Sequence, residues 1–470
     1  MRQVDTDVAI VGAGISGLVA ATRLAELGIR VLVLEKGQQD KYPCNTRMSG
    51  GAFHVAHRDI EEEPQVILDA INNRTRGTAR ADLVQAMASD MHSASRWLKG
   101  KGVRFIKVGH EVFRKHTLAP PIQTKGRNYW EGRGGDVLLR TLGNELEKHK
   151  GAILRGTEVK RLLMREGACV GVEATQNSEP LEVNAKSVIV CDGGFQSNMA
   201  LLREFISPAP EKLKQRNALS GNGDGLRMAR EVGAQLVGMN RFYGHVLAQD
   251  AMHNDDLWPF PMMDFVCMGG VVVDATGHRF MNEGLGGVSM ANAIASQSDP
   301  LGAVVIFDEA IWNEHGREYI SPANPLLISG GGTLHSAPDL TTLASQLGLP
   351  ADVLGKTVAQ YNATVESGQT GSLTPTRSVG AHKPHLISTA PFHAVRLCAG
   401  ITYTMGGIAI DGAARVMDTQ DAPIPGLYAA GCTTGGLEGG EHLAYIGGLS
   451  KSSVTALRAA NSVAKQFERA

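Results

Sequence analysis

The alternation of hydrophobic and polar residues near the start of the chain predicts a strand, a helix and a second strand. Four consecutive apolar residues, Val8 to Val11, indicate a buried strand. Residues Leu18 to Leu27 repeat their apolar positions with the period of a helix, which Gly28 then ends. A second apolar run follows at Val31 to Leu34. This order predicts a strand–helix–strand unit.

Apolar runs later in the chain predict further strands and helices. Residues 187–194 and 424–431 each have the pattern of a buried strand that runs into a glycine turn, and residues 157–159 are expected to close another strand. Helical spacing is found over residues 353–367 and 450–464. Strands that alternate with helices indicate an α/β fold, and a chain of 470 residues indicates two or three domains.

Composition and charge narrow the class of protein. Hydrophobic residues make up 43% of the chain and charged residues 20%, as in globular proteins with a large core. The net charge of -1 favours neither nucleic acid nor an anionic membrane as a partner. No apolar run approaches the roughly 18 residues of a membrane span. Because no signal peptide precedes the first strand and the cysteines form no CxxC pair, we expect a cytoplasmic protein with reduced thiols and no metal site.

The abundance of glycine adds a further expectation. The chain has 56 glycines, about 12% of its residues against roughly 7% in average proteins, and they cluster in loops. Glycine lets the backbone approach a ligand closely or take a positive φ. A large bound cofactor explains such clusters, and a surface rich in loops is the alternative.

The loop between the first strand and the first helix has the spacing GxGxxG, at Gly12, Gly14 and Gly17. Gly12 permits the tight turn, Gly14 lets a pyrophosphate reach the N–H groups at the helix N-terminus, and Gly17 lets helix and strand pack closely. Glu35, at the end of the second strand, is placed to accept a hydrogen bond from a ribose 2′-hydroxyl. This order predicts an adenine dinucleotide, and since no second such motif follows, we expect FAD rather than a pyridine nucleotide.

Six segments spread over nearly the whole chain resemble a known flavoprotein family. They are the N-terminal GxGxxG region, NTRMSGG (45–51), GNGDGLRMAREVGA (221–234), GHRFMNE (277–283), YTMGGIAID (403–411) and IPGLYAAG (424–431). The family includes fumarate reductases and succinate dehydrogenases, and the site pattern is most similar to tricarballylate dehydrogenase and 3-ketosteroid Δ1-dehydrogenases. The resemblance implies a Rossmann-like FAD-binding domain, residues 1–240 and 400–470, interrupted by an α+β cap (substrate) domain, residues 241–399.

The resemblance also extends the expected FAD site beyond the GxGxxG turn. In the family, NTRMSGG lies beside the isoalloxazine ring, and turns at strand ends contact the rest of the cofactor. The expected FAD contacts are Gly12, Gly14, Ile15, Ser16, Gly17, Glu35, Lys36, Asn45, Thr46, Met48, Ser49, Gly50, Gly51, Val159, Asp192, Gly193, Gly194, Asp224, Gly431, Cys432, Gly448 and Leu449.

The family's chemistry, hydride transfer to or from a carbon next to an activating carbonyl or carboxylate, suggests four catalytic residues. His245 matches the histidine that contacts a substrate carboxylate in fumarate reductases, and Tyr243 shares its strand face. Tyr403 occupies the position of a second substrate-binding histidine, and Tyr445 that of a carboxylate-binding arginine. In ketosteroid dehydrogenases a tyrosine and a backbone N–H polarise a ketone in that segment, which implies an oxyanion hole at Tyr445. For each residue, a packing role is the alternative.

At one position the chain departs from both subfamilies. A few residues after RFMNE (279–283), fumarate reductases have an arginine proton donor and ketosteroid dehydrogenases a tyrosine base, but this chain has Gly287. A slip of one or two residues would bring in Ser289. Otherwise glycine makes room for a bulkier substrate, or another residue moves the proton. The candidates are Tyr403, His245, Tyr243, His442 and Glu441.

Two further features leave alternatives open. Cys44 occupies the position of the histidine that binds flavin covalently in succinate dehydrogenases, so a cysteinyl flavin and an ordinary thiol are both compatible with the sequence. The segment GRNYWEGRGGD (126–136) contains a polar and aromatic group, Arg127, Tyr129, Trp130 and Arg133. It suits a substrate lid or a carboxylate clamp as well as a solvated loop.

Three functions therefore remain open. The first is an FAD-dependent dehydrogenase that desaturates a ketone or carboxylic acid, because the two absent arginines count against a small dicarboxylate. The second is a fumarate reductase-like enoate reductase, which His245 supports. The third is a flavin-binding module without turnover, which Gly287 suggests. The ligand would be a small molecule, and oxygen, a quinone or an iron–sulfur partner would be the electron acceptor.

Overall fold

A six-stranded sheet carries the N-terminal unit that the hydrophobic pattern predicts. The computed structural model describes residues 2–123, 129–380, 382–438 and 444–468. The strand order is β20-β21-β11-β2-β3-β7, parallel except for β20. The strands are β2 (Val8–Val11), β3 (Val31–Glu35), β7 (Ala152–Arg155), β11 (Ser187–Val190), β20 (Arg415–Met417) and β21 (Pro423–Ala429).

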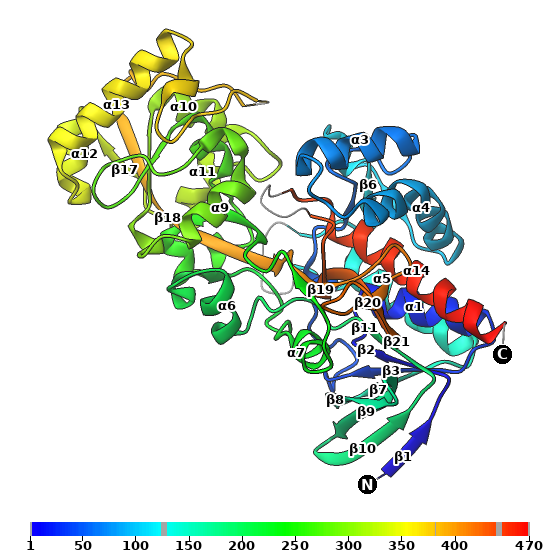
Figure 1. The fold of residues 1–470 in the computed structure, drawn as a ribbon. Helices are drawn as coiled ribbons and strands as arrows, with labels where there is room; N and C mark the ends of the chain where they lie inside the picture. Colours follow the sequence, from blue (N-terminus) through cyan, green and yellow to red (C-terminus); the bar gives the residue numbers. More distant parts are fainter. Residues whose placement is uncertain (1, 124–128, 381, 439–443, 469–470) are drawn as a thin grey trace.

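Helices from both ends of the chain pack beside this sheet, so that the N- and C-terminal parts form one unit (Figure 1). Helix α1 contacts both α5 and α14, and α3 packs on α4. The helices are α1 (Ile15–Glu26), α2 (Asn45–Met48), α3 (Pro64–Thr75), α4 (Ala81–Gly100), α5 (Gly134–Lys148), α7 (Asp224–Glu231) and α14 (Gly448–Phe467).

Smaller sheets flank the main one. Strands β1 (Arg2–Asp5), β8 (Thr157–Arg165), β9 (Ala168–Gln176) and β10 (Glu179–Asn184) form a four-stranded sheet. Strands β4 (Ala52–Phe53), β5 (Phe105–Ile106) and β6 (His116–Leu118) form a second, and β13 (Leu236–Val237), β19 (Gly407–Ala409) and β22 (Thr434–Gly435) a third.

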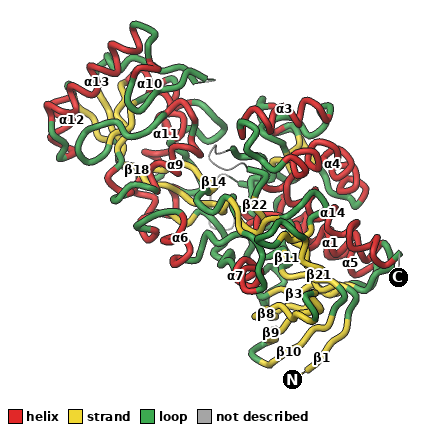
Figure 2. Tube along the Cα trace, viewed as in Figure 1, coloured by secondary structure: helices red, strands yellow, loops and turns green. Residues whose placement is uncertain are grey.

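A separate sheet and most of the remaining helices form the other end of the molecule (Figure 2). Its strand order is β12-β18-β16-β15, with β14 and β17 also paired to β18. The strands are β12 (Lys214–Gln215), β14 (Phe242–Ala248), β15 (Val271–Val273), β16 (Val304–Asp308), β17 (His335–Ala337) and β18 (Phe392–Thr404). The helices are α6 (Met199–Phe205), α8 (Asp264–Gly269), α9 (Gly287–Ala295), α10 (Glu309–Asn313), α11 (Ala323–Ser329), α12 (Leu340–Leu347) and α13 (Ala351–Glu366).

Two hydrophobic cores correspond to these two ends. Buried residues between Val8 and Cys191 share the first core with residues near the C-terminus, such as Ile408 and Val463. The second core takes buried residues between Phe195 and Ile401. Strand β18 belongs to the second core and leads directly into β19, whose Ile408 lies in the first.

The structure confirms most of the predicted elements and corrects one. The predicted strands and helices of the N-terminal unit, and the helices over residues 353–367 and 450–464, occur within a few residues of their expected bounds. The expectation that residues 157–159 close a strand is wrong. Gly156, with φ at 66°, separates β7 from β8, so Thr157 begins a strand. No helix among the described residues is long and apolar enough to cross a membrane.

Candidate active site

A single large cavity brings the predicted cofactor residues and the predicted catalytic residues together. Its volume is about 1570 Å³, above the roughly 300–1,000 Å³ typical of pockets for small ligands. The lining includes Gly12 from the glycine turn and Tyr243 from β14. The cavity is therefore large enough for a dinucleotide and a second small molecule.

The turn before α1 fits a ligand that approaches the backbone closely. Gly12 has φ at 94°, and a Cβ on it would lie 2.8 Å from the Cys191 carbonyl oxygen. A Cβ on Gly17 would lie 1.9 Å from the Gly12 oxygen, so the helix and turn pack with no room for a side chain. The N-terminus of α1 faces the cavity at Gly14 and Ile15, where N–H groups and the helix dipole favour an anion.

Two carboxylates in the cavity lining are held by backbone N–H groups. Glu35 accepts hydrogen bonds from the N–H groups of Ala13 (2.9 Å) and Gly37 (2.7 Å). Asp192 Oδ2 accepts from Gly225 N–H at 2.7 Å, whereas its buried Oδ1 makes no hydrogen bond to the described residues. Burial raises the pKa of Asp192 to about 6. Both carboxylates have lone pairs left for hydroxyl donors, which fits the ribose and ribityl groups of FAD.

The segment NTRMSGG lies against β18 and the glycine turn. Asn45 Nδ2 donates to the Thr402 oxygen at 2.9 Å, and Asn45 Oδ1 accepts from Ala218 N–H at 2.9 Å. Thr46 Oγ1 accepts from Ile15 N–H at 3.1 Å. This segment thus connects the start of α1 to the strand that holds Tyr403.

Nearly all predicted FAD contacts line this one cavity. Gly17 and Gly431 do not, and both instead allow close packing behind the turn. A Cβ on Gly431 would lie 2.0 Å from Ser16 Oγ. The predicted contacts that line the cavity are Gly12, Gly14, Ile15, Ser16, Glu35, Lys36, Asn45, Thr46, Met48, Ser49, Gly50, Gly51, Val159, Asp192, Gly193, Gly194, Asp224, Cys432, Gly448 and Leu449.

The four predicted catalytic residues lie together in the cavity. Strands β14 and β18 pair Tyr243 with Tyr403, and their rings are 5.4 Å apart. The ring of Tyr445 stacks on Tyr243 with centroids 3.9 Å apart. His245 Nε2 lies 2.9 Å from the Tyr243 hydroxyl. The three tyrosines come from distant parts of the sequence, so only the fold brings them into contact.

Asp264, which the sequence analysis missed, completes this group. Its Oδ2 lies 2.6 Å from His245 Nδ1, and its Oδ1 accepts from Val246 N–H at 2.8 Å. A carboxylate at Nδ1 favours the tautomer with the proton on that nitrogen, so Nε2 accepts a hydrogen bond from Tyr243. We call Tyr243, His245, Asp264, Tyr403 and Tyr445 the tyrosine–histidine cluster. The available signal was one acid within the apolar segment PMMDFVCMGG.

The position of Asp264 accounts for Gly287. A Cβ on Gly287 would lie 1.9 Å from Asp264 Oδ2, so any larger residue would displace that carboxylate. Ser289 also lines the cavity. The glycine is therefore required by a carboxylate in the adjacent helix α8.

Burial sets the protonation of the three tyrosines. It raises the pKa of Tyr243 to about 12 and holds the pKa values of Tyr403 and Tyr445 well above the usual value of 10. The Tyr403 hydroxyl is buried and has no partner among the described residues. The Tyr445 hydroxyl accepts from Gly448 N–H at 3.5 Å, so this N–H supports the tyrosine. At neutral pH all three are protonated.

A pair of histidines that the sequence analysis did not single out borders the cluster. His54 and His57 stack with ring centroids 5.1 Å apart, and the His54 ring meets Tyr445 edge-on at 5.1 Å. Burial lowers the pKa of His57 to about 4 and that of His54 well below 6.5. Both rings are neutral at pH 7 and extend the aromatic surface around Tyr445.

The remaining candidates are distributed between the cavity and its surroundings. Tyr129 lines the cavity and donates to the Met48 oxygen at 3.3 Å, whereas Trp130 and Arg133 lie outside the lining. Arg216, also missed, lines it and donates to Thr402 Oγ1 at 3.0 Å. Arg127, Glu441 and His442 lie outside the described residues.

Cys44 also lines the cavity, and its thiol is free of any disulfide. Burial raises its pKa to about 11, so the thiol is protonated at neutral pH. A protonated thiol is a weak nucleophile. This favours the ordinary thiol over the cysteinyl flavin, the two alternatives that the sequence left open.

The chain is similar to a known protein family and to several curated proteins. Residues 7–447 match a family model described as FAD binding domain. The NADH:fumarate oxidoreductase of Klebsiella pneumoniae (strain 342) is 25% identical over 93% of this chain, and the urocanate reductase of Eggerthella lenta is 28% identical over 91%. The chain spans 45% of the length of the first and 69% of the second.

Solved structures show the same fold. A flavocytochrome c3 fumarate reductase in an open conformation has a TM-score of 0.68 and 23% identity, and covers 98% of this chain and 78% of its own. The 3-ketosteroid-Δ4-(5α)-dehydrogenase from Rhodococcus jostii RHA1 has a TM-score of 0.72 and 23% identity. The match covers 99% of this chain and 98% of the dehydrogenase chain. At these identities the likeness concerns the fold alone.

Proposed function

Because this chain belongs to the FAD-binding-domain family, we propose that it is an FAD-dependent oxidoreductase that desaturates a CH–CH bond next to a carbonyl or carboxylate group. The observation that carries the proposal is the hydrogen-bonded series Asp264–His245–Tyr243 in the same cavity as the glycine turn. A ketosteroid dehydrogenase shares the fold, and the curated relatives include an NADH:fumarate oxidoreductase and a urocanate reductase.

The predicted FAD contacts would hold the cofactor along the glycine turn. The N–H groups at the start of α1 suit its pyrophosphate, Glu35 its adenosine ribose, and Asp192 its hydroxylated chain. Bound FAD would supply the acceptor or donor of a hydride at the substrate carbon. The chain itself must then bind the carbonyl and move one proton.

Tyr243 is the proposed proton-transfer group. Its pKa of about 12 means that it does not ionise alone at neutral pH. His245 Nε2 can take the hydroxyl proton as the tyrosine oxygen takes a proton from the α-carbon of the substrate. Asp264 orients the ring and stabilises the imidazolium that forms. In the reverse direction the same groups return the proton.

Tyr403 and Tyr445 are the proposed carbonyl-binding groups. Both remain protonated at neutral pH because burial raises their pKa values, and the Tyr403 hydroxyl is free to donate to a ligand. Donors to the carbonyl oxygen stabilise the enolate that develops when the α-proton leaves. This arrangement places acid–base and electrophilic roles on different tyrosines.

Reduction of an enoate is the second candidate function. One relative named above is a urocanate reductase, and a relay that accepts a proton can also donate it. Arg216 in the cavity lining offers a positive charge for a carboxylate. The two candidates share a site and differ in the direction that the reaction takes. In the dehydrogenase direction, the electron acceptor would be oxygen, a quinone or an iron–sulfur partner.

We also propose the domain division expected from the sequence. Residues 1–240 and 400–470 would form the FAD-binding domain, and residues 241–399 an α+β cap over the substrate. The separation of the two hydrophobic cores supports this division, although Phe195 to Leu226 contribute to the second core from outside the proposed cap.

Anaerobic titration of the flavin-loaded protein tests the proposed function. Loss of the visible absorbance of the oxidised flavin on addition of a saturated cyclic ketone or acid supports desaturation. Recovery of that absorbance when an enone or enoate is added to the reduced protein supports reduction. No response to any of these ligand classes would contradict both candidates and leave a flavin-binding module.

A further inference from the structure

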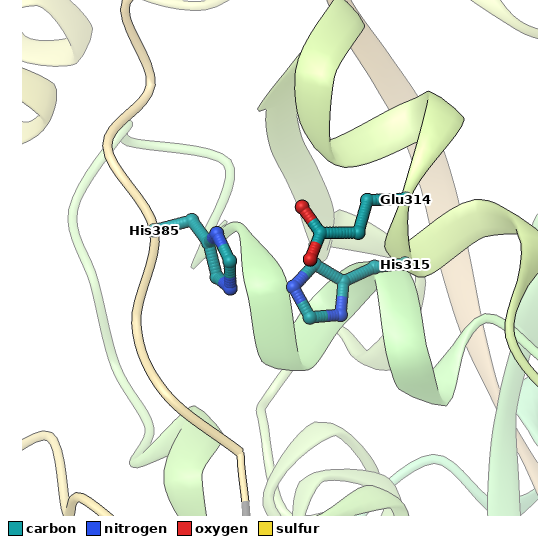
Figure 3. Close-up of side chains that lie close together, drawn as sticks. All are labelled: Glu314, His315 and His385. Atoms are coloured by element: carbon teal, nitrogen blue, oxygen red, sulfur yellow. The ribbon is translucent and has the colours of Figure 1, made fainter.

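A second group of polar residues lies in the second core region, outside the tyrosine–histidine cluster. We propose that Glu314, His315 and His385 form a binding site for a divalent transition-metal ion, with Zn²⁺ as its probe. One ligand atom from each residue lies within 4.8 Å of the others. In Figure 3 the imidazole rings of His315 and His385 lie next to one another, with the Glu314 carboxylate beside them. The proposal is independent of the proposed reaction.

The surroundings of His315 leave a nitrogen available to a ligand. The side chain is buried, with 6% exposed, and its Nε2 has no hydrogen-bond partner among the described residues. Nδ1 lies 2.7 Å from Glu318 Oε1, although off the line of a hydrogen bond. A carboxylate beside one ring nitrogen favours the proton there and leaves the lone pair on the other, as in many metal-binding histidines.

The fold makes room for this ring. A Cβ on Gly269 would lie 2.6 Å from His315 Cδ2, so glycine at the end of α8 allows the ring to occupy its place. The rings of His315 and His385 meet at 78° with centroids 4.3 Å apart, which rules out parallel stacking as the reason for their contact. Two nearly perpendicular imidazoles can direct nitrogens at a common point.

The ligand types fit a metal of the zinc group. Two imidazoles and one carboxylate are the donor set of many zinc sites that keep a fourth position for water. Imidazole also suits Cu²⁺ and Ni²⁺, whereas Mg²⁺ and Ca²⁺ prefer oxygen ligands. A single carboxylate leaves a net positive charge on the complex, which the nearby Glu318 would balance.

The other cluster of ligand-type residues provides a contrast. Asp59, Glu61 and His116 also lie close together, but a lysine ammonium group already pairs with each carboxylate. Lys115 contacts Asp59, and Lys99 Nζ lies 2.8 Å from Glu61. Among the described residues, these two clusters alone have metal-ligand spacing. The ion pairs of Asp59 and Glu61 include lysines, whereas the ion pair of His315 is with Glu318 and includes none.

A bound ion would fix part of the cavity lining. His385 lies in the stretch between Ser372 and β18, where the described residues form no helix or strand, while Glu314 and His315 follow α10. Tyr319, shortly after His315, and His382, shortly before His385, line the large cavity. The ion would therefore join two segments that border the cavity.

Zinc binding to the flavin-loaded protein tests this site. After removal of metals with a chelator, calorimetric titration with Zn²⁺ should give one tight site per chain. Glu314→Gln and His385→Ala should each weaken zinc binding by at least ~10-fold, because each removes a ligand. His116→Ala, in the contrasting cluster, is the control and should bind zinc as the unaltered chain does. Flavin content shows that each variant is folded.

Thermal unfolding gives a second readout. Zinc at about 100 times its Kd should raise the Tm of the unaltered chain and of His116→Ala, since the ion binds the folded state. It should raise the Tm of His385→Ala by a smaller amount, because the same zinc concentration saturates the weakened site less fully. The inference is overturned if the unaltered chain binds no zinc, or if Glu314→Gln and His385→Ala bind zinc with unchanged affinity.

Discussion

The glycine turn and the tyrosine–histidine cluster line the same cavity but are built in different ways. The turn is mostly backbone: Gly12 and Gly17 remove side chains so that N–H groups can face a ligand. The cluster is made of side chains from β14, β18, α8 and the segment before α14. Its residues are joined by hydrogen bonds and ring contacts across the fold.

Because of this difference, we expect the glycine turn and the tyrosine–histidine cluster to respond differently to amino-acid substitutions. A backbone site depends on space, so that a single added methyl group can block it. A side-chain cluster depends on chemistry, and conservative changes should keep its shape while removing one proton or one charge. Substitutions can therefore separate binding of the cofactor from the reaction.

The largest effect is expected at the glycine turn. In Gly17→Ala the new Cβ would lie 1.9 Å from the Gly12 oxygen, so the turn must move and flavin content should fall by at least ~100-fold. The measurement is flavin absorbance per chain after purification. Gly143→Ala in α5 is the control, because its Cβ meets nothing closer than 4.0 Å. Normal flavin content in Gly17→Ala would show that the turn does not limit cofactor binding.

The next largest effect is expected for Tyr243→Phe. Loss of the hydroxyl removes the proposed proton-transfer group, which should slow flavin reduction by substrate by roughly 10²–10⁴-fold. Flavin content should stay normal, because the turn is unaltered. Stopped-flow absorbance measures the rate, with Tyr428→Phe in the first core as the control. A rate equal to that of the unaltered chain would remove Tyr243 from the mechanism.

A smaller effect is expected for Gly287→Ala. The added Cβ would overlap the Asp264 carboxylate and shift it from His245, so the rate should fall by roughly 10–100-fold with flavin content unchanged. Ser289→Ala tests the alternative that the serine moves the proton. If Ser289→Ala is the slower of the two variants, the serine and not the relay carries that role.

The smallest effect concerns stability and pH. Burial lowers the pKa of His57 to about 4 from 6.5, so between these values the unfolded chain binds more protons than the folded one. The contribution of the neutral His57 ring to the free energy of unfolding is complete above pH 6.5 and is lost as the pH falls towards 4. Because His57 is only partly buried, the loss should be about 1–2 kcal/mol.

The pH effect can be measured as the shift of the urea midpoint between pH 7.5 and 4.5. His57→Gln should show a smaller shift than the unaltered chain, since glutamine does not titrate. His253→Gln, at an exposed position, is the control. Identical shifts in all three proteins would mean that His57 gains a proton equally in the folded and unfolded states.

The sequence predicts the glycine turn well because its parts are local. Strand, turn, helix and acid follow one another between Val8 and Glu35, and each signal is a short-range pattern. The strand over residues 157–159 was misplaced because the turn at Gly156 was not recognised. Residues 187–194 and 424–431 were assigned correctly as strands that end near the cavity.

The cluster was only partly predictable, since its contacts are not local. The family resemblance pointed to His245, Tyr403 and Tyr445, and the period of a strand added Tyr243; all four line the cavity. Asp264 had no such signal, because its role depends on contacts with His245 and with the space that Gly287 leaves. The role of Gly287 is explained only by its neighbour in space, the Asp264 carboxylate.

Strand β18 has a further consequence for how proteins with this architecture can diversify. It is rooted in the second core, yet its last residues pair with β14 beside Tyr243, and Thr404 Oγ1 accepts from Phe195 N–H at 3.0 Å. The loops and helices between β16 and β18 can therefore change in length and composition while this strand keeps the tyrosines aligned with the glycine turn. We expect new substrate preferences to arise by replacement of those outer segments, with the chemistry inherited intact.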